Sequence, residues 1–536
     1  MKNLSLGTQD FQTLRERDYI YVDKTKYIFE MINDGRINFL SRPRRFGKSL
    51  LLNTIEKLYD GNKNLFEDLY VYDKWDWNKT HPVVKIDFGK GEYNSLAQLN
   101  DSLNDFLDGI SENFDVKLKR RTLTARFGEL IEKIYKKSNK RVVVLIDEYD
   151  MPISDNFSNI SILNEVQKVL KNFYNVLKTC DAFIEFIFIT GISKFANTSI
   201  FSTLNSTIDL TIDDKFSCLC GYTIQELEKH FKDHILNLGN KLNLNYEETL
   251  DKIKYWYDGY SWDGENRVYA PYSCLELFYF KEFNNYWFKT GTPKYLIDFL
   301  RNNGDYSEVL DPIFIKNSRL DPFTYEKIDP IAIFFETGYL TIVEKKIIND
   351  VIHYKLQTPN FEIESSMLDH LINLSFTLKK DENIKNKLIT YLKNEDNKNF
   401  QKEIKGFLTK IPSRIHINQE FYYQSIYIAW LNALGFKVEG ESQTNIGSMD
   451  MILEKKDYII IVECKFSKMK EKRNEPIKPY KTMLTEAINQ IKNKKYYEKY
   501  PNKKIIMVAL SFAGKEVFTR IEKIDHVKSE EVLRKS

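Results

Sequence analysis

The chain has 536 residues, of which 42% are hydrophobic and 29% are charged, and 79 basic against 76 acidic residues leave a net charge of +3. This composition is typical of a globular protein with several folded cores, and it excludes a fibre, a disordered chain and a disulfide-rich miniprotein. The near-neutral total predicts no polyanion partner for the chain as a whole. Residues 451–536, however, contain 21 basic and 12 acidic residues, a local charge of +9. This segment is a candidate nucleic-acid footprint, although the lysine enrichment of an AT-rich genome would look the same.

The five cysteines form an odd and sparse set, which predicts a reducing compartment. Cys218 and Cys220 lack the second ligand pair that a zinc site needs. The N-terminus has no hydrophobic signal core, and no stretch of about 18 apolar residues could span a membrane. We therefore expect a cytoplasmic protein with no membrane partner.

The first 220 residues alternate short apolar strands with helical patterns, which predicts a parallel α/β sheet with right-handed crossovers. The continuous apolar run at 142–146 is typical of a strand buried on both faces. The strands are expected at 37–41, 83–88, 142–146 and 182–192, and the helical patterns cover 96–137 and 162–178.

A mainly helical pattern follows from about residue 222 and is interrupted by an aromatic loop at 256–273. For its part 256–264, a packing role between domains and a functional role are equally good interpretations. The last part of the chain reads as a separate α/β unit, with a helix at 420–435, strands near 436–440, 449–454 and 458–466, a helix at 482–499 and a strand at 504–512. The predicted domains are therefore 1–220, 221–400 and 401–536.

The segment 42–49, RPRRFGKS, lies between a predicted strand and a predicted helix, the context of a phosphate-binding loop. It has the second glycine, the lysine and the serine of GxxxxGK[ST], while Arg42 stands at the first glycine. Backbone amides and a helix N-terminus would hold phosphates, Lys48 would neutralise the β- and γ-phosphates, and Ser49 would bind Mg²⁺. The candidate nucleotide contacts are Arg44, Arg45, Phe46, Gly47, Lys48, Ser49 and Leu50.

The string DEYD ends the strand at 142–146, where a parallel sheet places its ligands. Asp147 would hold Mg²⁺ and Glu148 would polarise the attacking water as a catalytic base. A solvated charge cluster that caps the strand is the alternative interpretation. Thr190 and Ser193, past the strand at 182–192, are candidate polar sensors of the γ-phosphate, although such residues also end strands routinely.

A second acidic constellation occupies the C-terminal unit. Asp450 lies in one apolar strand and Glu463-Cys464-Lys465 ends the next, with a hairpin turn expected at 454–457. Strand alternation places Glu463 and Lys465 on one face and Cys464 on the other. Asp450 and Glu463 would hold Mg²⁺, and Lys465 would orient the water and offset charge on a phosphate. A solvated E-x-K pair at a strand edge is the alternative.

Several longer strings resemble the AAA-ATPase-like family, which is usually fused to a C-terminal nuclease-like domain. They cover most of the chain: YVDKT (21–25), FLSRPRRFGKSLLL (39–52), LIDEYD (145–150), WYDGYSWDG (256–264), RVYAP (267–271), FNNYWFKTGTP (283–293) and ETGYLTI (336–342). The resemblance implies an AAA-like P-loop fold that binds ATP, and the family's own RPRRFGKS form has the arginine of position 42. Tyr269-Ala270-Pro271 departs from the family's Y-N-P. Arg44, Arg45 and Arg267 are candidates for contacts with phosphate. A structural role is the alternative interpretation for each of them.

The C-terminal unit is similar to the PD-(D/E)xK superfamily, which implies a restriction-endonuclease-like α/β fold. By this resemblance Glu420 matches the superfamily's helical acid and Gln490 its helix glutamine, and both join the candidate catalytic set. The family branch often reads G-R-x-D where this chain has Gly447-Ser448-Met449-Asp450.

The resulting hypothesis is an enzyme that binds or hydrolyses ATP and carries a Mg²⁺-dependent nuclease acting on nucleic acid, with DNA as the expected partner. ATP would gate the nuclease or its engagement of DNA. The alternative is a signalling-type regulatory ATPase whose nuclease-like domain binds nucleic acid without cleaving it. A non-catalytic scaffold is the weakest hypothesis, because it leaves both charged constellations unexplained. The sequence does not decide the oligomeric state, and a homo-oligomer is one open alternative.

Overall fold

The chain forms two compact units, Met1–Glu364 and Ser365–Ser536, in a computed structural model. The residues that the structure describes are 2–157, 159–194, 207–291, 296, 312–320, 329–367, 382–408, 420–433, 436, 438–444, 447–454, 457–467, 476–494, 503–513 and 516–524. Each unit has its own sheet and its own core. Residues 221–364, from the helical middle of the sequence, belong to the first unit.

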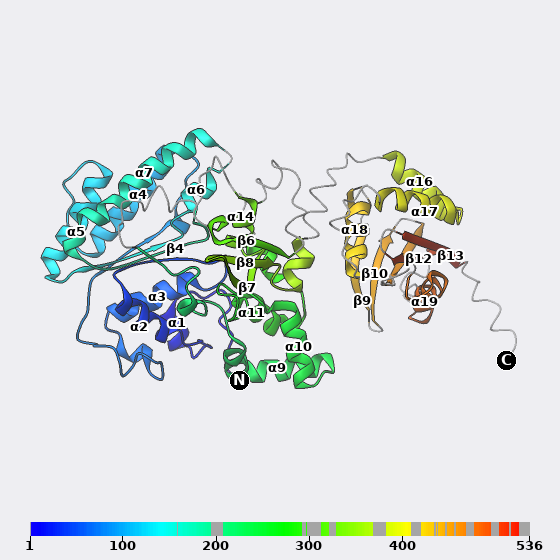
Figure 1. Ribbon diagram of the computed structural model, residues 1–536, viewed down its shortest axis with the longest axis horizontal. Coiled ribbons are helices and arrows are strands. Elements are labelled where there is room, and N and C mark those ends of the chain that lie inside the picture. Colours follow the sequence, from blue (N-terminus) through cyan, green and yellow to red (C-terminus); the bar gives the residue numbers. More distant parts are fainter. Residues whose placement is uncertain are drawn as a thin grey trace. The chain divides into compact units, whose positions relative to one another are not determined.

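The first unit is built on a five-stranded parallel sheet in the order β2-β3-β4-β1-β5 (Figure 1). Its strands are β1 (Ile37–Ser41), β2 (Val83–Asp87), β3 (Val142–Asp147), β4 (Ile184–Gly191) and β5 (Ile208–Asp209). This confirms the α/β class that the alternating pattern predicted. Every residue of β3 is buried because helices cover both faces of the sheet.

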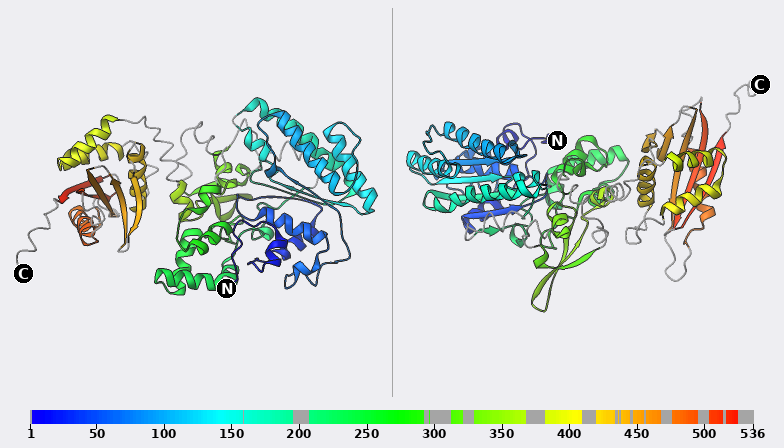
Figure 2. Two further views of the ribbon diagram at one scale, coloured as in Figure 1. Left: turned by 180° about the vertical axis from the view of Figure 1, so that it is seen from behind. Right: turned by 90° about the horizontal axis from the view of Figure 1, so that it is seen from above.

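Two groups of helices sandwich this sheet, as the views from opposite sides and from above show (Figure 2). On one face lie α1 (Phe11–Glu16), α2 (Thr25–Asp34) and α3 (Lys48–Tyr59). On the other lie α4 (Leu96–Asn113), α5 (Leu123–Ser138) and α7 (Ile160–Thr179), with the short α6 (Met151–Asp155) nearby. The helical pattern predicted over 96–137 is thus two helices, α4 and α5, joined by a loop.

A helical region follows and includes α9 (Ile224–Leu242), α10 (Tyr246–Tyr257), α11 (Pro271–Phe280), α12 (Tyr286–Gly291) and α14 (Pro330–Glu336). Capping boxes at Thr223 and Asn245 begin α9 and α10, each with a glutamate at the third helical position. Apolar side chains of α9, α10 and α11 form one core cluster with Ile20 and Val22 of the N-terminal segment. The region is therefore packed onto the start of the chain.

The first unit also holds a three-stranded antiparallel sheet that the sequence pattern did not predict. Its strands, in the order β6-β8-β7, are β6 (Ile313–Lys316), β7 (Thr341–Ile348) and β8 (Val351–Gln357). Asn349 and Asp350 join β7 to β8 with positive φ angles of 50° and 60°. Two such residues between strands are the usual signal of a tight hairpin turn, and this signal stood in the sequence.

The second unit has a mixed five-stranded sheet in the order β13-β12-β11-β10-β9. Its strands are β9 (Val438–Thr444), β10 (Gly447–Glu454), β11 (Tyr458–Phe466), β12 (Lys504–Ala513) and β13 (Glu516–Ile524), and its helices are α16 (Glu382–Lys393), α17 (Asn397–Leu408), α18 (Glu420–Ala433) and α19 (Tyr480–Asn493). Side chains of α19 share a core cluster with Ile459 and Ile461 of β11. Side chains of α16, α17 and α18 gather around Ile460 and Val462, on the alternate face. The sheet is therefore covered on both faces, as the predicted α/β class requires.

Among the described helices, none combines the length and the hydropathy that a membrane crossing requires. All five cysteines are buried and unpaired with one another.

Candidate functional site

The loop between β1 and α3 has the backbone conformation of an anion-binding loop. Arg45 and Gly47 have φ angles of 67° and 91°, in the left-handed region, and Gly47 is the N-cap of α3. A Cβ added at Gly47 would meet nothing within 4 Å, so the backbone angle and not space calls for glycine here. Alternating handedness turns successive amides inward, and the helix N-terminus adds its dipole.

Lys48 follows this turn and folds back over it. Its Nζ donates hydrogen bonds to the carbonyl oxygens of Arg42 and Pro43, at 2.8 and 3.0 Å, and the side chain is buried. Burial lowers the pKa of Lys48, while the negative charge of Glu148 and Asp147 opposes that shift. The ammonium is thus held at the centre of the loop, with two carboxylates as its electrostatic partners.

Arg42, at the position of the missing first glycine, is a structural residue turned away from the loop. Its guanidinium donates to the carbonyl oxygens of Ser41, Thr211 and Phe216 and lies 3.9 Å from the ring centroid of Trp262. Burial lowers its pKa to about 10. The arginine at this position therefore stabilises the loop through its contacts with Thr211, Phe216 and Trp262.

The aromatic loop at 256–264 packs against the same phosphate-binding loop. The buried ring of Phe46 meets Tyr260 and Trp262 edge-on, with centroids 4.8 and 5.6 Å apart. Edge-to-face pairs of this kind favour one fixed geometry. Within the first unit, Tyr260 and Trp262 therefore pack against the phosphate-binding loop.

Asp147 and Glu148 stand at the carboxyl end of β3, as predicted. Asp147 is 2% exposed, and its Oδ1 accepts a 2.7 Å hydrogen bond from Thr190 Oγ1 on the neighbouring strand β4. Glu148 has a φ of 50°, and burial raises the pKa of its carboxyl while Lys48 lowers it. Two acids with different environments therefore lie beside the loop, one fixed by Thr190 and one partly open.

The two predicted sensors are buried and face carboxylates. Thr190 donates to Asp147, and Ser193 donates to Asp150 through both its hydroxyl (2.7 Å) and its backbone N–H (2.9 Å). In this geometry the two residues would act on a nucleotide through the acids that they hold. Asp150, the last residue of DEYD, was not singled out from the sequence.

Asp87 is another acid that sequence reasoning missed. It ends β2 in register with Asp147 on β3, and a Cβ added at Gly89 would lie 3.1 Å from both the Asp87 and the Glu148 carboxylates. The strand ends bring these acids together, and the terminal aspartate of VVKID was the available signal.

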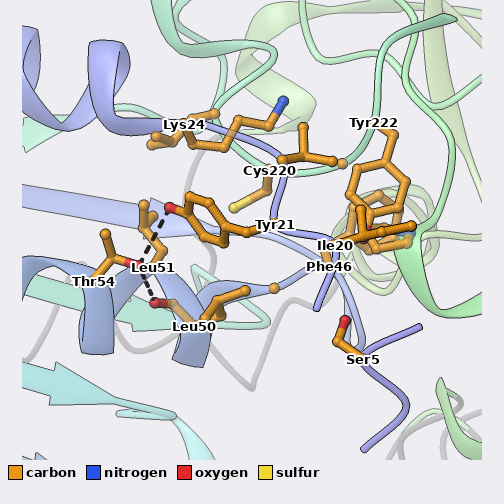
Figure 3. Close-up of a pocket in the computed structure, with 15 residues that line it drawn as sticks. Ser5, Ile20, Tyr21, Lys24, Phe46, Leu50, Leu51, Thr54, Cys220 and Tyr222 are labelled. Atoms are coloured by element: carbon orange, nitrogen blue, oxygen red, sulfur yellow. Dashed lines mark hydrogen bonds between the residues drawn. The ribbon is translucent and has the colours of Figure 1, made fainter. Parts of the chain in front are cut away.

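A cleft of about 390 Å³ opens at the loop, and its polar lining residues include Lys48, Ser49, Arg44 and Glu148. A smaller, mainly apolar pocket of about 70 Å³ adjoins it, and Ser5, Gly47, Leu50, Tyr222 and Pro271 line both cavities. Figure 3 shows this pocket, in which the Tyr21 hydroxyl lies 3.5 Å from that of Thr54, and Thr54 donates to the Leu50 carbonyl. The residues present therefore fit a ligand with a charged end and an apolar end.

Trp287 ties the loop to the end of the first unit. Its indole Nε1 donates to the Arg44 carbonyl at 2.9 Å, and its backbone N–H donates to Glu362 Oε1 at 2.7 Å. Ser273 donates to the other carboxylate oxygen of Glu362, whose pKa burial raises to about 7. Glu362 belongs to the helical segment 361–367 that begins the connection to the second unit. A continuous set of hydrogen bonds thus runs from the loop to that segment.

The ETGYLTI segment (336–342) packs against the phosphate-binding loop at Pro43. Gly338, at a φ of 87°, leaves only 2.8 Å between an added Cβ and the Pro43 side chain. Glu336 accepts a 3.0 Å hydrogen bond from the Lys194 backbone, and Lys194 Nζ lies 2.7 Å from Asp209. Burial raises the pKa of Glu336 to about 8.

From the raised pKa of Glu336 we predict how the free energy of unfolding depends on pH. An unfolded glutamate releases its proton near pH 4.5, so the folded state holds more protons between pH 4.5 and about 8, and stability falls as pH rises through that window. Glu336→Gln mimics the protonated acid and is expected to reduce this fall by on the order of 2 kcal/mol. Chemical unfolding at pH 5.5 and 8.5 measures the effect, with Glu344→Gln on β7 as the control. Equal pH slopes for wild type and Glu336→Gln would contradict the prediction.

The second candidate site lies at the end of β11. Glu463 is 1% exposed, and its Oε1 lies 3.2 Å from Lys465 Nζ. The β10–β11 pairing runs from Glu454 with Ile459 to Met451 with Val462, so its continuation by one residue sets position 450 opposite Glu463. β10 ends at Glu454 and β11 begins at Tyr458, and residues 455–456 of the turn predicted at 454–457 lie outside the described residues.

The remaining predicted residues of this site are only partly described. Gln490 is half-buried on α19, the helix that covers the Glu463 face of the sheet. Glu420 begins α18 and Asp450 lies in β10, but the side chains of both are outside the described residues. Within the described part of the chain, no three potential ligand side chains gather into a metal site. The donor chemistry at Glu463 fits a hard divalent cation, because a buried carboxylate oxygen is the ligand that such ions prefer.

Comparison with known proteins agrees with the two predicted domain types. Residues 5–201 match the family described as "Predicted AAA-ATPase", and residues 418–522 match the "PD-(D/E)XK nuclease superfamily". These matches and the two sheets define a P-loop ATPase joined to a nuclease-superfamily domain, a class of enzymes that usually use a nucleotide and a divalent metal ion.

A relative matches almost the whole chain. The "Uncharacterized protein in vnfD 5'region" of Azotobacter chroococcum mcd 1 is 35% identical over 507 residues, which are 93% of this chain and 94% of the relative. The chain belongs to the AAA-ATPase-like family, with a C-terminal domain of the PD-(D/E)XK nuclease superfamily.

Proposed function

We propose that the protein binds and hydrolyses ATP in its first unit and cleaves nucleic acid, with DNA as the substrate, in its second. Mg²⁺ would serve both sites. ATP would control how the nuclease engages its substrate. The observation that carries the proposal is the assembly of Lys48, Asp147 and Glu148 around an anion-binding loop, in a chain whose second unit presents the Glu463–Lys465 pair.

The nucleotide half rests on the shape and charge of the cleft. The inward-facing amides would bind the phosphates. Lys48 would also bind them, exchanging its present hydrogen bonds to the Arg42 and Pro43 carbonyls for bonds to phosphate. The apolar pocket beside Leu50 would bind the base. Ser49 and Asp147 would hold the metal ion, which neutralises phosphate charge. Glu148, which lies beside the loop with its carboxyl partly buried and near Lys48, would accept the proton of the attacking water.

The nuclease half rests on the hairpin geometry. Asp450 and Glu463 would hold the divalent cation, which supplies charge stabilisation for phosphodiester cleavage. Lys465, within 3.2 Å of Glu463, would orient the water and stabilise negative charge on the scissile phosphate. Gln490 and Glu420 would support this arrangement from the two neighbouring helices.

The control of the nuclease by ATP would run through Trp287. A shift of the Arg44 carbonyl on nucleotide binding would be felt by the indole N–H, and through Glu362 by the segment 361–367. The hydrogen bond from the Trp287 backbone to Glu362 (2.7 Å) is buried, and the one from its indole to the Arg44 carbonyl (2.9 Å) is partly buried. A displacement of one partner would therefore be passed on to the other.

The direct test is plasmid nicking by the full-length protein with Mg²⁺ or Mn²⁺, with and without ATP. Metal-dependent nicking that changes on ATP addition supports the proposal. Salt-sensitive DNA binding without nicking would instead support the regulatory ATPase with a non-cleaving nuclease-like domain.

A further inference from the structure

A strongly basic stretch lies in the ATPase unit, outside the residues assigned above. Residues 115–141 contain ten basic and three acidic residues, a net charge of +7, whereas the whole chain carries +3. The stretch comprises the loop between α4 and α5, the helix α5, and the turn into β3. This stretch is therefore a locally basic segment of the first unit.

The loop between α4 and α5 has a fixed backbone path. The backbone N–H groups of Lys119 and Arg120 both donate to Glu129 Oε2 at 2.8 Å, and Lys133 Nζ donates to the Lys117 carbonyl. Because Glu129 and Lys133 lie one turn apart on α5, the loop runs back along the side of this helix. The side chains of this loop therefore extend from a backbone of fixed conformation.

Four cations on this loop are exposed and lack acidic partners. Within the described residues, Lys117, Lys119, Arg120 and Arg121 form no ion pair. The lysines of α5 differ, since Lys133, Lys136 and Lys137 pair with Glu129, Glu132 and Asp115. Four uncompensated charges close together repel one another and attract an external polyanion.

We propose that Lys117, Lys119, Arg120 and Arg121, the α5 cationic loop, bind the phosphate backbone of a nucleic acid. This inference rests on the proposed function, which makes nucleic acid the substrate, and it adds a contact on the ATPase unit. Consecutive residues of an open loop advance by about 3.3 Å, so the four cations extend over on the order of 10 Å. That distance is the rise of about three phosphates of one strand, and arginine pairs with phosphate through two donors.

The test is the affinity of the full-length protein for a fluorescent duplex of about 30 base pairs and for its single strand, by anisotropy over a KCl titration with EDTA present to prevent cleavage. Arg120→Glu/Arg121→Glu is compared with Lys229→Glu/Lys232→Glu, which makes the same charge change at two exposed lysines of α9. Neither arginine side chain makes a described hydrogen bond, so the fold should survive.

The arginine variant is expected to bind about tenfold or more weakly than wild type near 100 mM KCl, with the slope of log K against log salt reduced by about 2 for the duplex. The α9 variant should bind like wild type. Equal weakening by both variants, no change in the arginine variant, or binding of the loop to phosphatidylserine vesicles without binding to either nucleic acid would overturn the inference. Cleavage is scored separately, so loss of nicking with intact loop-dependent binding would count against the proposed nuclease and not against this surface.

Discussion

Glu148→Gln is expected to lower the rate of ATP turnover by roughly 10²-fold or more, while ATP affinity stays within a few-fold of wild type. Glutamine keeps the size and shape of Glu148, but it replaces one acceptor oxygen by an NH2 group and cannot accept a proton from water. The loop amides, Lys48 and Asp147, which would bind the nucleotide, are unchanged. Turnover is measured as phosphate release, and affinity with a fluorescent ATP analogue.

The surface variant Glu132→Gln is the control, since it makes the same chemical change on α5, where Glu132 pairs with Lys136. Its turnover should equal that of wild type. If Glu148→Gln hydrolyses ATP as fast as wild type, Glu148 is not the base. Asp87 then becomes the next acid to test, because its carboxylate lies beside Gly89, as that of Glu148 does.

Lys465→Met is expected to reduce metal-dependent cleavage by roughly 10²-fold or more, and Glu463→Gln by a similar factor. The methionine side chain fills nearly the same space without the charge that would stabilise the phosphate. The two residues lie 3.2 Å apart and would act as a unit. The double variant should therefore nick DNA no more slowly than the slower of the two single variants. Initial nicking rates on supercoiled plasmid measure all three.

Lys504→Met at the exposed start of β12 is the matched control, and thermal melting of each variant separates lost chemistry from lost folding. Asp450→Asn provides a second route to the same conclusion. Cleavage that persists in Lys465→Met and in Asp450→Asn, in folded protein, would refute the assignment of this hairpin as the nuclease site.

The sequence predicted the features that depend on local pattern. Continuous apolar runs located β1, β3 and β4, and the GKS and DEYD strings located the loop and the acids at the strand ends. Each of these depends on residues within a few positions of one another, where strand and helix periodicity fixes the geometry.

The features that the sequence did not predict depend on distant partners. Trp287 donates to the Arg44 carbonyl across 243 positions, and Arg42 reaches the Thr211 carbonyl across 169. No periodicity encodes such contacts, so Arg42 could not be recognised as a structural anchor. The β7–β8 hairpin was missed for a different reason, since Ile347, Ile348 and Val351 are exposed and break the alternation that usually marks a half-buried strand.

In the proposed function, nucleotide bound at Lys48 controls chemistry at Glu463 and Lys465, and one comparison of nicking rates tests this control directly. Plasmid nicking is measured for wild type and Lys48→Ala with Mg²⁺, each with and without ATP, with Lys57→Ala on the same helix as the control. We expect ATP to change the nicking rate of wild type and Lys57→Ala, and to leave that of Lys48→Ala at its nucleotide-free level. A Lys48→Ala protein whose nicking responds to ATP as wild type does, or a wild type that nicks no DNA, would contradict the account.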